Sequence, residues 1–268
     1  MSQSSDFLDY YLLVIAIIVP CYNEEFRFDV GKWNILMQLV PRCTWIYVDD
    51  GSSDQTFLTL SKLEPGKCHI LRLETNVGKG EAIRAGLNFA LTSDFSDGIN
   101  QIGYLDADGA FAMEDIIRMI EFSAEQFLFN SKINSIISSR VKLAGREISR
   151  NTRRHYLGRV IGTYIGMSWK EAPYDTQSGF KIFRVDSNFL KAIAERFQTR
   201  WFFDIELLLR LHSISESYPW EFPLTKWNEV GNSRIDMQQV VLIFREILRI
   251  RRIIRKNLVT EGVQNGFN

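Results

Sequence analysis

The stretch QIGYLDADGAF, Gln101 to Phe111, runs from apolar residues directly into two aspartates that flank one alanine. The residues before Asp106 are typical of a buried strand, and the glycine after Asp108 is typical of a turn. Two carboxylates this close repel each other unless a positive charge lies beside them. The stretch therefore predicts a strand that ends at a binding site, with a metal ion between or beside the two acids.

Working outward from this stretch, apolar strand-like runs alternate with helix-period segments through the first half of the chain. This alternation predicts strands at 13–19, 44–50, 68–73 and 101–108, and helices at 25–39, 53–63, 78–91 and 113–129. Continuous apolar strands separated by helices are typical of a mainly parallel sheet covered on both faces. The expected fold class is α/β.

The second half of the chain is less regular. It predicts strands at 133–140 and 178–183, a helix at 200–213, and a further helix that follows a basic stretch and ends near Trp169. Because no linker is visible in the composition, we expect one large domain. Its expected bounds are 13–233, after an N-terminal extension at 1–12 and before a C-terminal amphipathic helix and tail at 234–268.

The bulk composition excludes several classes of protein. Among the 268 residues, Lys and Arg together number 32, and Asp and Glu together also number 32. The chain therefore has no overall positive charge that would indicate nucleic-acid binding. The cysteines, Cys21, Cys43 and Cys68, lack zinc-binding spacing and favour a reducing, cytoplasmic compartment. The apolar run at 10–20 is about half of the roughly 20 residues that a membrane-spanning helix needs, and it is interpreted as a buried strand.

Polar loops follow the first strands at the point where each strand ends. These loops are PCYNEE (20–25), VDDGSSD (48–54), TNVGKG (75–80) and LDADG (105–109). Ligands of open α/β sheets gather at the carboxyl ends of the strands. We therefore expect the four loops to form one site at one edge of the sheet.

Two of these loops permit both a functional and a structural interpretation. A carboxylate in VDDGSSD can accept hydrogen bonds from a nucleoside base or ribose, but Ser52, Ser53 and Asp54 can instead cap the next helix. Lys79 lies between two glycines, where a cation is available to phosphate, although the P-loop spacing is absent. The alternative for Lys79 is a solvated surface lysine.

Asp106 and Asp108 provide oxygen ligands of the kind that Mg²⁺ or Mn²⁺ prefers in proteins. Such an ion can bridge a diphosphate and stabilise the charge that develops when the diphosphate leaves. The letters DADG also resemble the nucleophile motif of haloacid-dehalogenase-type phosphatases. That motif normally follows the first strand of its domain, whereas here three predicted strands precede it.

No histidine supports a Ser-His-Asp or HExxH site, because His69, His155 and His212 are isolated in the sequence. Asp204 and Glu206 stand at the start of the helix predicted at 200–213. They are either helix caps that complement the helix dipole or functional acids that face a cleft.

Taken together, IIVPCYNEE, YVDDGSSDQT, NVGKGEAIRAG and YLDADGA resemble the family 2 inverting glycosyltransferases, which have the GT-A fold. In the second half, SSR, DTQSGFKIF, RWFFDIELL and WNEVGNSRI resemble the polyprenyl- or dolichyl-phosphate hexosyltransferase branch, especially the dolichyl-phosphate glucose synthases. The similarity covers residues 13 to 252, with the motifs in order.

The resemblance implies a nucleotide-sugar donor and a divalent cofactor, Mg²⁺ or Mn²⁺. The residues it implies for nucleotide binding are Pro20, Tyr22, Asn23, Glu24, Asp49, Asp50 and Lys79. Asp106 and Asp108 would be the DxD pair that holds the metal. The glucose branch favours UDP-glucose as donor.

The implied acceptor is an isoprenoid lipid phosphate. The second pKa of this phosphate is about 6, so at pH 7 it is already an anionic nucleophile and needs cations to bind it more than it needs a general base. The residues expected to bind this phosphate are Arg140, Arg153, Arg154 and Gln177. The alternative is a saccharide hydroxyl acceptor, for which Asp204 would act as general base. A second alternative is a catalytically silent nucleotide-sugar-binding protein.

The C-terminal segment at 240–256 combines six basic residues with apolar residues at helical spacing. Such a basic amphipathic helix can lie on an anionic membrane surface. The competing interpretation is a helix that packs on the domain or on a second copy of the chain. We expect a peripheral enzyme at the cytoplasmic face of a membrane, which can form a homo-oligomer.

Overall fold

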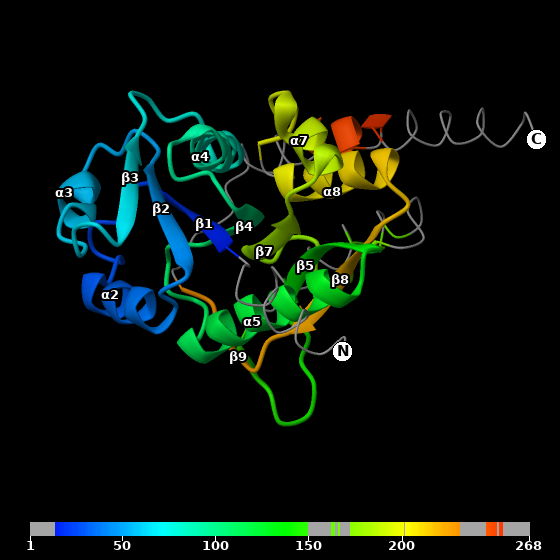
Figure 1. Cartoon of the computed structure of the whole chain (residues 1–268), viewed down its shortest axis with the longest axis horizontal. Coiled ribbons are helices and arrows are strands. Elements are labelled where there is room, and N and C mark those ends of the chain that lie inside the picture. Colours follow the sequence, from blue (N-terminus) through cyan, green and yellow to red (C-terminus); the bar gives the residue numbers. More distant parts are fainter. Residues whose placement is uncertain are drawn as a thin grey trace, which may run out of the picture.

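The computed structural model describes residues 14–149, 162–163, 166, 172–200, 202–230, 245–250 and 252–253. Within these residues a seven-stranded sheet has the order β3-β2-β1-β4-β7-β5-β8 (Figure 1). Its strands are β1 (Val14–Cys21), β2 (Cys43–Asp49), β3 (Cys68–Arg72), β4 (Ile99–Leu105), β5 (Ile133–Ser139), β7 (Phe180–Arg184) and β8 (Tyr218–Pro223). A short parallel pair, β6 (Glu147–Ser149) and β9 (Lys226–Asn228), stands apart from it.

The predicted mainly parallel sheet is confirmed. β1 pairs in parallel with β2 and with β4, β2 pairs in parallel with β3, and β5 pairs in parallel with β8. The exception is β7, which lies antiparallel between β4 and β5. Because β7 runs in the opposite direction, it begins at the edge of the sheet where β4 ends. This reversal places the residues before β7 beside Asp106.

Helices cover both faces of the sheet, as predicted (Figure 1). They are α2 (Val30–Leu39), α3 (Thr56–Leu60), α4 (Lys79–Thr92), α5 (Met113–Phe129), α7 (Ser187–Ala194) and α8 (Phe203–Ile214). Alternation along β1 divides the core: Ile15, Ile17 and Val19 pack with α2 and α5, whereas Ala16 and Ile18 pack with α4 and α8. Both faces of β1 are buried, which explains its continuous apolar sequence.

The expected helix at 53–63 is wrong over most of its length, because only α3 is regular there. The reason is local hydrogen bonding. The Ser53 amide donates to Asn23 Oδ1 at 3.0 Å, and Asp54 Oδ1 accepts from the Thr56 amide at 2.9 Å. These bonds hold the turn after β2 against the turn after β1. The helix expected from residue 25 begins instead at Val30, where Asp29 caps it by accepting from the Lys32 amide.

Several predicted segments lie wholly or mostly outside the described residues: the extension at 1–12, the helix ending near Trp169, of which residues 162, 163 and 166 are described and helical, and most of 234–268. The part of the C-terminal segment that the structure describes is helical at 245–250. Glu246 and Ile250 are buried there, and Ile247 packs on the α4 and α8 side of the core. The burial of these residues favours the interpretation in which the helix packs on the domain. In the described chain, no helix has both the length and the apolar character needed to cross a membrane.

Gly103 of β4 is required by the neighbouring strand. A Cβ at this position would lie 2.3 Å from the carbonyl oxygen of Lys181 and 3.1 Å from Ile182 Cα, both backbone atoms of β7. We expect Gly103→Ala to lower the free energy of unfolding by about 1–3 kcal/mol or more, because neither strand can move without breaking the ladder. Urea denaturation measures the loss. Gly31→Ala in α2, with its nearest atom at 3.4 Å, is the matched control and should be neutral or stabilising; equal losses in both variants would contradict the account.

Candidate functional site

A cleft of about 640 Å³ opens at the carboxyl ends of β1, β2 and β4. Nine of the predicted site residues line it: Pro20, Tyr22, Glu24, Asp50, Lys79, Asp106, Asp108, Gln177 and Asp204. The loops that were expected to meet at one edge of the sheet therefore do meet. The cleft is also lined by residues that the sequence did not single out, namely Cys21, Arg27, Asn76, Gly78, Ala107, Arg200 and Phe203.

Asp50 organises the loop that follows β3. Its carboxylate accepts from the Val77 amide at 2.8 Å, from the Gly78 amide at 3.0 Å and from Asn76 Nδ2 at 3.0 Å. Burial raises the pKa of Asp50, although the bonds from the Val77 and Gly78 amides and the charge of Arg200 oppose the rise. Asp49 is buried and does not line the cleft; its carboxylate accepts from the Ser52 amide at 3.0 Å and lies 3.4 Å from Arg72 Nε.

The turn after β1 carries Asn23 and Glu24. Asn23 has φ 52° and joins the turns after β1 and β2, but it does not line the cleft. The Glu24 side chain faces the cleft and pairs with Arg27 Nη2 at 2.7 Å. Burial, together with the negative charge of Asp108, raises the pKa of Glu24 to about 7, although Arg27 opposes the rise.

Asp106 and Asp108 lie at the end of β4, facing the cleft. Lys79 Nζ lies 2.5 Å from Asp106 Oδ1, so part of the positive charge expected beside the pair is a lysine at the start of α4. Burial opposes the charge of Lys79, but Asp106 and Asp204 outweigh it and raise its pKa. Burial and the charge of Asp106 raise the pKa of Asp108.

The pair fits a divalent cation that keeps other ligands. Within the described residues, no cluster of three or more His, Cys, Asp or Glu side chains is arranged to hold a metal. Two carboxylates suffice for Mg²⁺ or Mn²⁺, which retain waters and take phosphate oxygens as further ligands. Gly179 makes room for this arrangement, since a Cβ there would lie 2.1 Å from Asp106 Oδ2. The residues present therefore fit the expected ion.

Asp204 also lines the cleft, where it is buried at the first turn of α8. Tyr104 donates its hydroxyl to the Asp204 carboxylate, and Lys181 Nζ donates to Asp204 Oδ1 at 3.1 Å. Burial raises the pKa of Asp204 to about 7, although Lys79 opposes the rise. Burial and the nearby Lys79 lower the pKa of Lys181 well below its ordinary value. Lys181 is not among the predicted site residues; a lysine inside the apolar run FKIF is the signal that could have indicated it.

The raised pKa of Asp204 predicts how stability changes with pH. The folded chain keeps this proton between the ordinary pKa of 3.8 and about 7, where the unfolded chain has released it. Stability therefore falls as pH rises through this window. We expect the free energy of unfolding of Asp204→Asn, relative to the wild-type chain, to rise by about 1–3 kcal/mol between pH 4.5 and pH 8. Chemical denaturation at several pH values measures the difference; Glu24 titrates in both chains and cancels. A pH-independent difference would contradict the assignment.

Only two of the residues predicted to bind the acceptor phosphate, Arg140 and Gln177, are among the described residues. Arg140 follows β5 and forms a bidentate pair with Asp175, with Nε to Oδ2 and Nη2 to Oδ1 both 2.7 Å, and its guanidinium lies 5.0 Å above the Trp227 ring. Arg140 is not among the residues that line the cleft, whereas Gln177 is. Arg153 and Arg154 lie outside the described residues.

Residues 16–189 match the family model described as glycosyl transferase family 2. The chain is 29% identical over 261 residues to dolichyl-phosphate beta-glucosyltransferase ALG5D of Trichomonas vaginalis, across 92% of this chain and 75% of that protein. It is 30% identical to the human dolichyl-phosphate beta-glucosyltransferase over 240 residues, 82% of this chain and 69% of that protein.

Among solved structures, the fold is similar to glucosyl-3-phosphoglycerate synthase from Mycobacterium tuberculosis in complex with Mg²⁺ and UDP. The TM-score is 0.63 with 14% identity, over 93% of this chain and 82% of that chain. The sheet, the two helical layers and the cleft at the carboxyl edge thus have the arrangement of the GT-A fold. The chain is a member of glycosyl transferase family 2, and it is a hexosyltransferase.

Proposed function

We propose that this enzyme transfers glucose from UDP-glucose to the phosphate of a dolichyl or other polyprenyl lipid, with inversion at the anomeric carbon. The observation that carries the proposal is that Asp106 and Asp108 share one cleft with Lys79 and with the loop that Asp50 organises. The named activity of the dolichyl-phosphate beta-glucosyltransferase relatives supports the lipid acceptor and the sugar. UDP in the similar structure supports the nucleotide.

In this proposal the nucleotide lies across the carboxyl edge of the sheet. Pro20 lies near the end of β1, Tyr22 and Asn23 follow that strand beside Glu24, and Asp49 ends β2 with Asp50 directly after it. Asp106 and Asp108 hold the divalent ion, which supplies positive charge to the diphosphate when it is bound. Lys79 Nζ, 2.5 Å from Asp106 Oδ1, adds a further positive charge beside the diphosphate.

The transfer itself is one displacement. An oxygen of the lipid phosphate forms a bond to C1 of glucose while the bond from C1 to the β-phosphate oxygen breaks, and UDP leaves with the electron pair. At pH 7 the phosphate is already an anion, so no protein group needs to remove a proton. Arg140, Arg153, Arg154 and Gln177 are the residues proposed to hold it.

A saccharide hydroxyl acceptor is the second candidate, and one observation favours it. Asp204 faces the cleft, and its pKa of about 7 suits a general base near neutral pH. With such an acceptor, activity should rise with pH through about 7 and disappear in Asp204→Asn. With a lipid phosphate acceptor, Asp204 has no proton to take, and the rise should be absent.

The experiment is a transfer assay with UDP- and GDP-hexoses and Mg²⁺ or Mn²⁺. Each donor is tested with a short polyprenyl phosphate, with the matching polyprenol, and with an oligosaccharide. A sugar on the polyprenyl phosphate, but not on the alcohol, is the expected result. If sugar appears on the oligosaccharide alone, the acceptor is a saccharide hydroxyl. Nucleotide binding without turnover would favour a catalytically silent binding protein.

The acceptor class implies a membrane surface, and we propose contact at the cytoplasmic face through residues 240–256, on the side of the exposed Leu248 and away from the buried Glu246 and Ile250. Cys21, Cys43 and Cys68 are free thiols, which agrees with a reducing compartment. The proposed catalytic domain is 13–233, and the chain can act as a homo-oligomer. Vesicle flotation with anionic and neutral lipids tests the membrane contact.

A further inference from the structure

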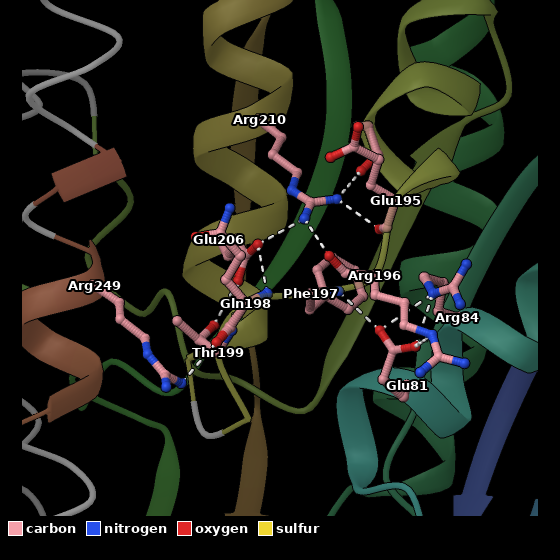
Figure 2. Close-up of polar contacts among 11 residues, drawn as sticks. Glu81, Arg84, Glu195, Arg196, Phe197, Gln198, Thr199, Glu206, Arg210 and Arg249 are labelled. Carbon is pink, nitrogen blue, oxygen red and sulfur yellow. Dashed lines mark hydrogen bonds and ion pairs between the residues drawn. The ribbon is translucent and has the colours of Figure 1, made fainter.

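The segment between α7 and α8 is held by an unusual set of bonds. Carboxylates from α4, α8 and the C-terminal helical segment accept hydrogen bonds from five of its backbone amides. Figure 2 shows the carboxylates of α4 and α8, which belong to Glu81 and Glu206. The bonds run from Phe197 to Glu81 at 2.8 Å, from Gln198 and Thr199 to Glu206 at 2.9 and 2.8 Å, and from Arg200 and Phe202 to Glu246 at 2.7 and 3.2 Å.

Two of these carboxylates are buried, Glu206 at 0% and Glu246 at 5% exposure. Burying a carboxylate is costly unless charged or strong donors satisfy it. Glu206 also pairs with Arg210 Nη2 at 2.7 Å, and Arg249 Nη1 donates to the carbonyl of Gln198 at 2.9 Å (Figure 2). Charge-assisted bonds of this kind fix the backbone, so the segment has one defined path.

The path of this segment places Arg200 at the cleft that Asp106 and Asp108 line. Arg200 Nη2 donates to Asn76 Oδ1 at 2.6 Å, and Asn76 Nδ2 donates to Asp50 Oδ2 at 3.0 Å. The arginine side chain lies against Gly78, where an added Cβ would be 2.8 Å from Arg200 Nε. A continuous chain of bonds therefore runs from Glu246 through Arg200 to the carboxylate that organises the loop after β3.

Arg200 differs from the other cations of the cleft. Among the described residues, Arg27, Lys79 and Arg200 supply its positive charges. Arg27 pairs with Glu24 at 2.7 Å and Lys79 pairs with Asp106 at 2.5 Å. The guanidinium of Arg200 donates instead to a neutral amide, and its charge opposes the rise that burial causes in the pKa of Asp50 without forming an ion pair with it among the described residues. Its charge is thus available to an anionic ligand, and a guanidinium suits phosphate oxygens.

We propose that Arg200 binds the diphosphate of the donor and that Glu246 is its positioning residue, so that the C-terminal segment completes the donor site. This inference rests on the proposed nucleotide-sugar donor. Glu246 touches no ligand: it sets the backbone of Arg200 and Phe202, and thereby the direction in which the arginine side chain enters the cleft.

The test is a double-mutant cycle on the binding of UDP with Mg²⁺, measured by calorimetry on the full chain. Arg200→Ala should weaken binding by about 10- to 100-fold, because one charged hydrogen-bonding partner is lost. Glu246→Ala should weaken it by about 10-fold, and Glu246→Gln, which keeps one acceptor oxygen, should lie in between. In the Arg200→Ala background, Glu246→Ala should have almost no further effect on binding. Leu248→Ala, exposed on the same turn, is the control and should bind as the wild type.

A purely structural role for Glu246 would lower the unfolding temperature and leave the affinity for UDP unchanged, which would overturn the inference. Additive losses in the double variant would also overturn it, as would full affinity in Arg200→Ala. If Glu246→Ala does not fold, the Glu246→Gln cycle decides in the same way. A wild-type chain that binds neither UDP nor UDP-glucose would overturn the proposed function together with this inference, whereas binding by all variants would overturn the inference alone.

Discussion

Asp108→Asn should reduce sugar transfer by about 10²- to 10³-fold in a chain that remains fully folded. Asparagine keeps the size of the side chain and the oxygen that accepts from the Ala110 amide at 3.0 Å. It removes the negative charge that is proposed to hold the metal. It also removes a charge that burial and Asp106 make unfavourable, so stability should be unchanged or higher.

The measurement pairs initial rates of transfer with thermal unfolding. In the wild-type chain, EDTA should abolish transfer and added Mg²⁺ or Mn²⁺ should restore it, whereas Asp108→Asn should not recover at the same metal concentration. Asp97→Asn, an exposed acid before β4, is the control and should retain full activity. Loss of stability in parallel with activity, or activity that survives chelation, would contradict the metal-binding role.

Gly179→Ala should lower transfer by about 10- to 100-fold through Asp106, without any change at an acidic residue. The added Cβ would lie 2.1 Å from Asp106 Oδ2 and 2.3 Å from its Cγ. The backbone cannot easily yield, because the Asp106 amide donates to the Gly179 carbonyl at 2.9 Å and β7 begins at the next residue. The Asp106 side chain must therefore turn away from its place beside Lys79.

A double-mutant cycle with Asp106→Asn tests whether Gly179→Ala acts through Asp106. If Gly179→Ala acts through Asp106, then adding it to Asp106→Asn should change the rate little, because the asparagine has already removed the metal ligand. Gly31→Ala in α2 is again the matched glycine control. Multiplicative losses would mean that the alanine acts elsewhere, for example by distorting the start of β7.

The parts of the site that the sequence predicted are those at the ends of consecutive parallel strands. Asp106, Asp50 and Lys79 each follow an apolar run or open a helix, and parallel strands bring such positions to one edge. For this reason the fold class and most of the cleft could be predicted. The turns themselves could not be resolved, and 53–63 was predicted as a helix although Ser53 and Asp54 are held by other bonds.

The remaining features depend on contacts between residues far apart in the chain. No pattern in the sequence indicates that β7 lies antiparallel between β4 and β5, and this arrangement brings Gly179 against Asp106. Likewise, Arg200 reaches the cleft because Glu246, 46 residues later, accepts from its backbone amide. No local pattern encodes such a pairing. Lys181 was missed because a lysine inside a strand is equally typical of an exposed edge.

The most direct test of the central claim follows labelled glucose from UDP-glucose into a lipid-extractable product. The purified chain is incubated with a polyprenyl phosphate in detergent and Mg²⁺, beside a sample with EDTA and a sample with Asp108→Asn. The account predicts a labelled glucosyl lipid phosphate in the first sample only. An extract without label, from a chain that binds UDP-glucose and transfers its sugar to a saccharide hydroxyl, would contradict it.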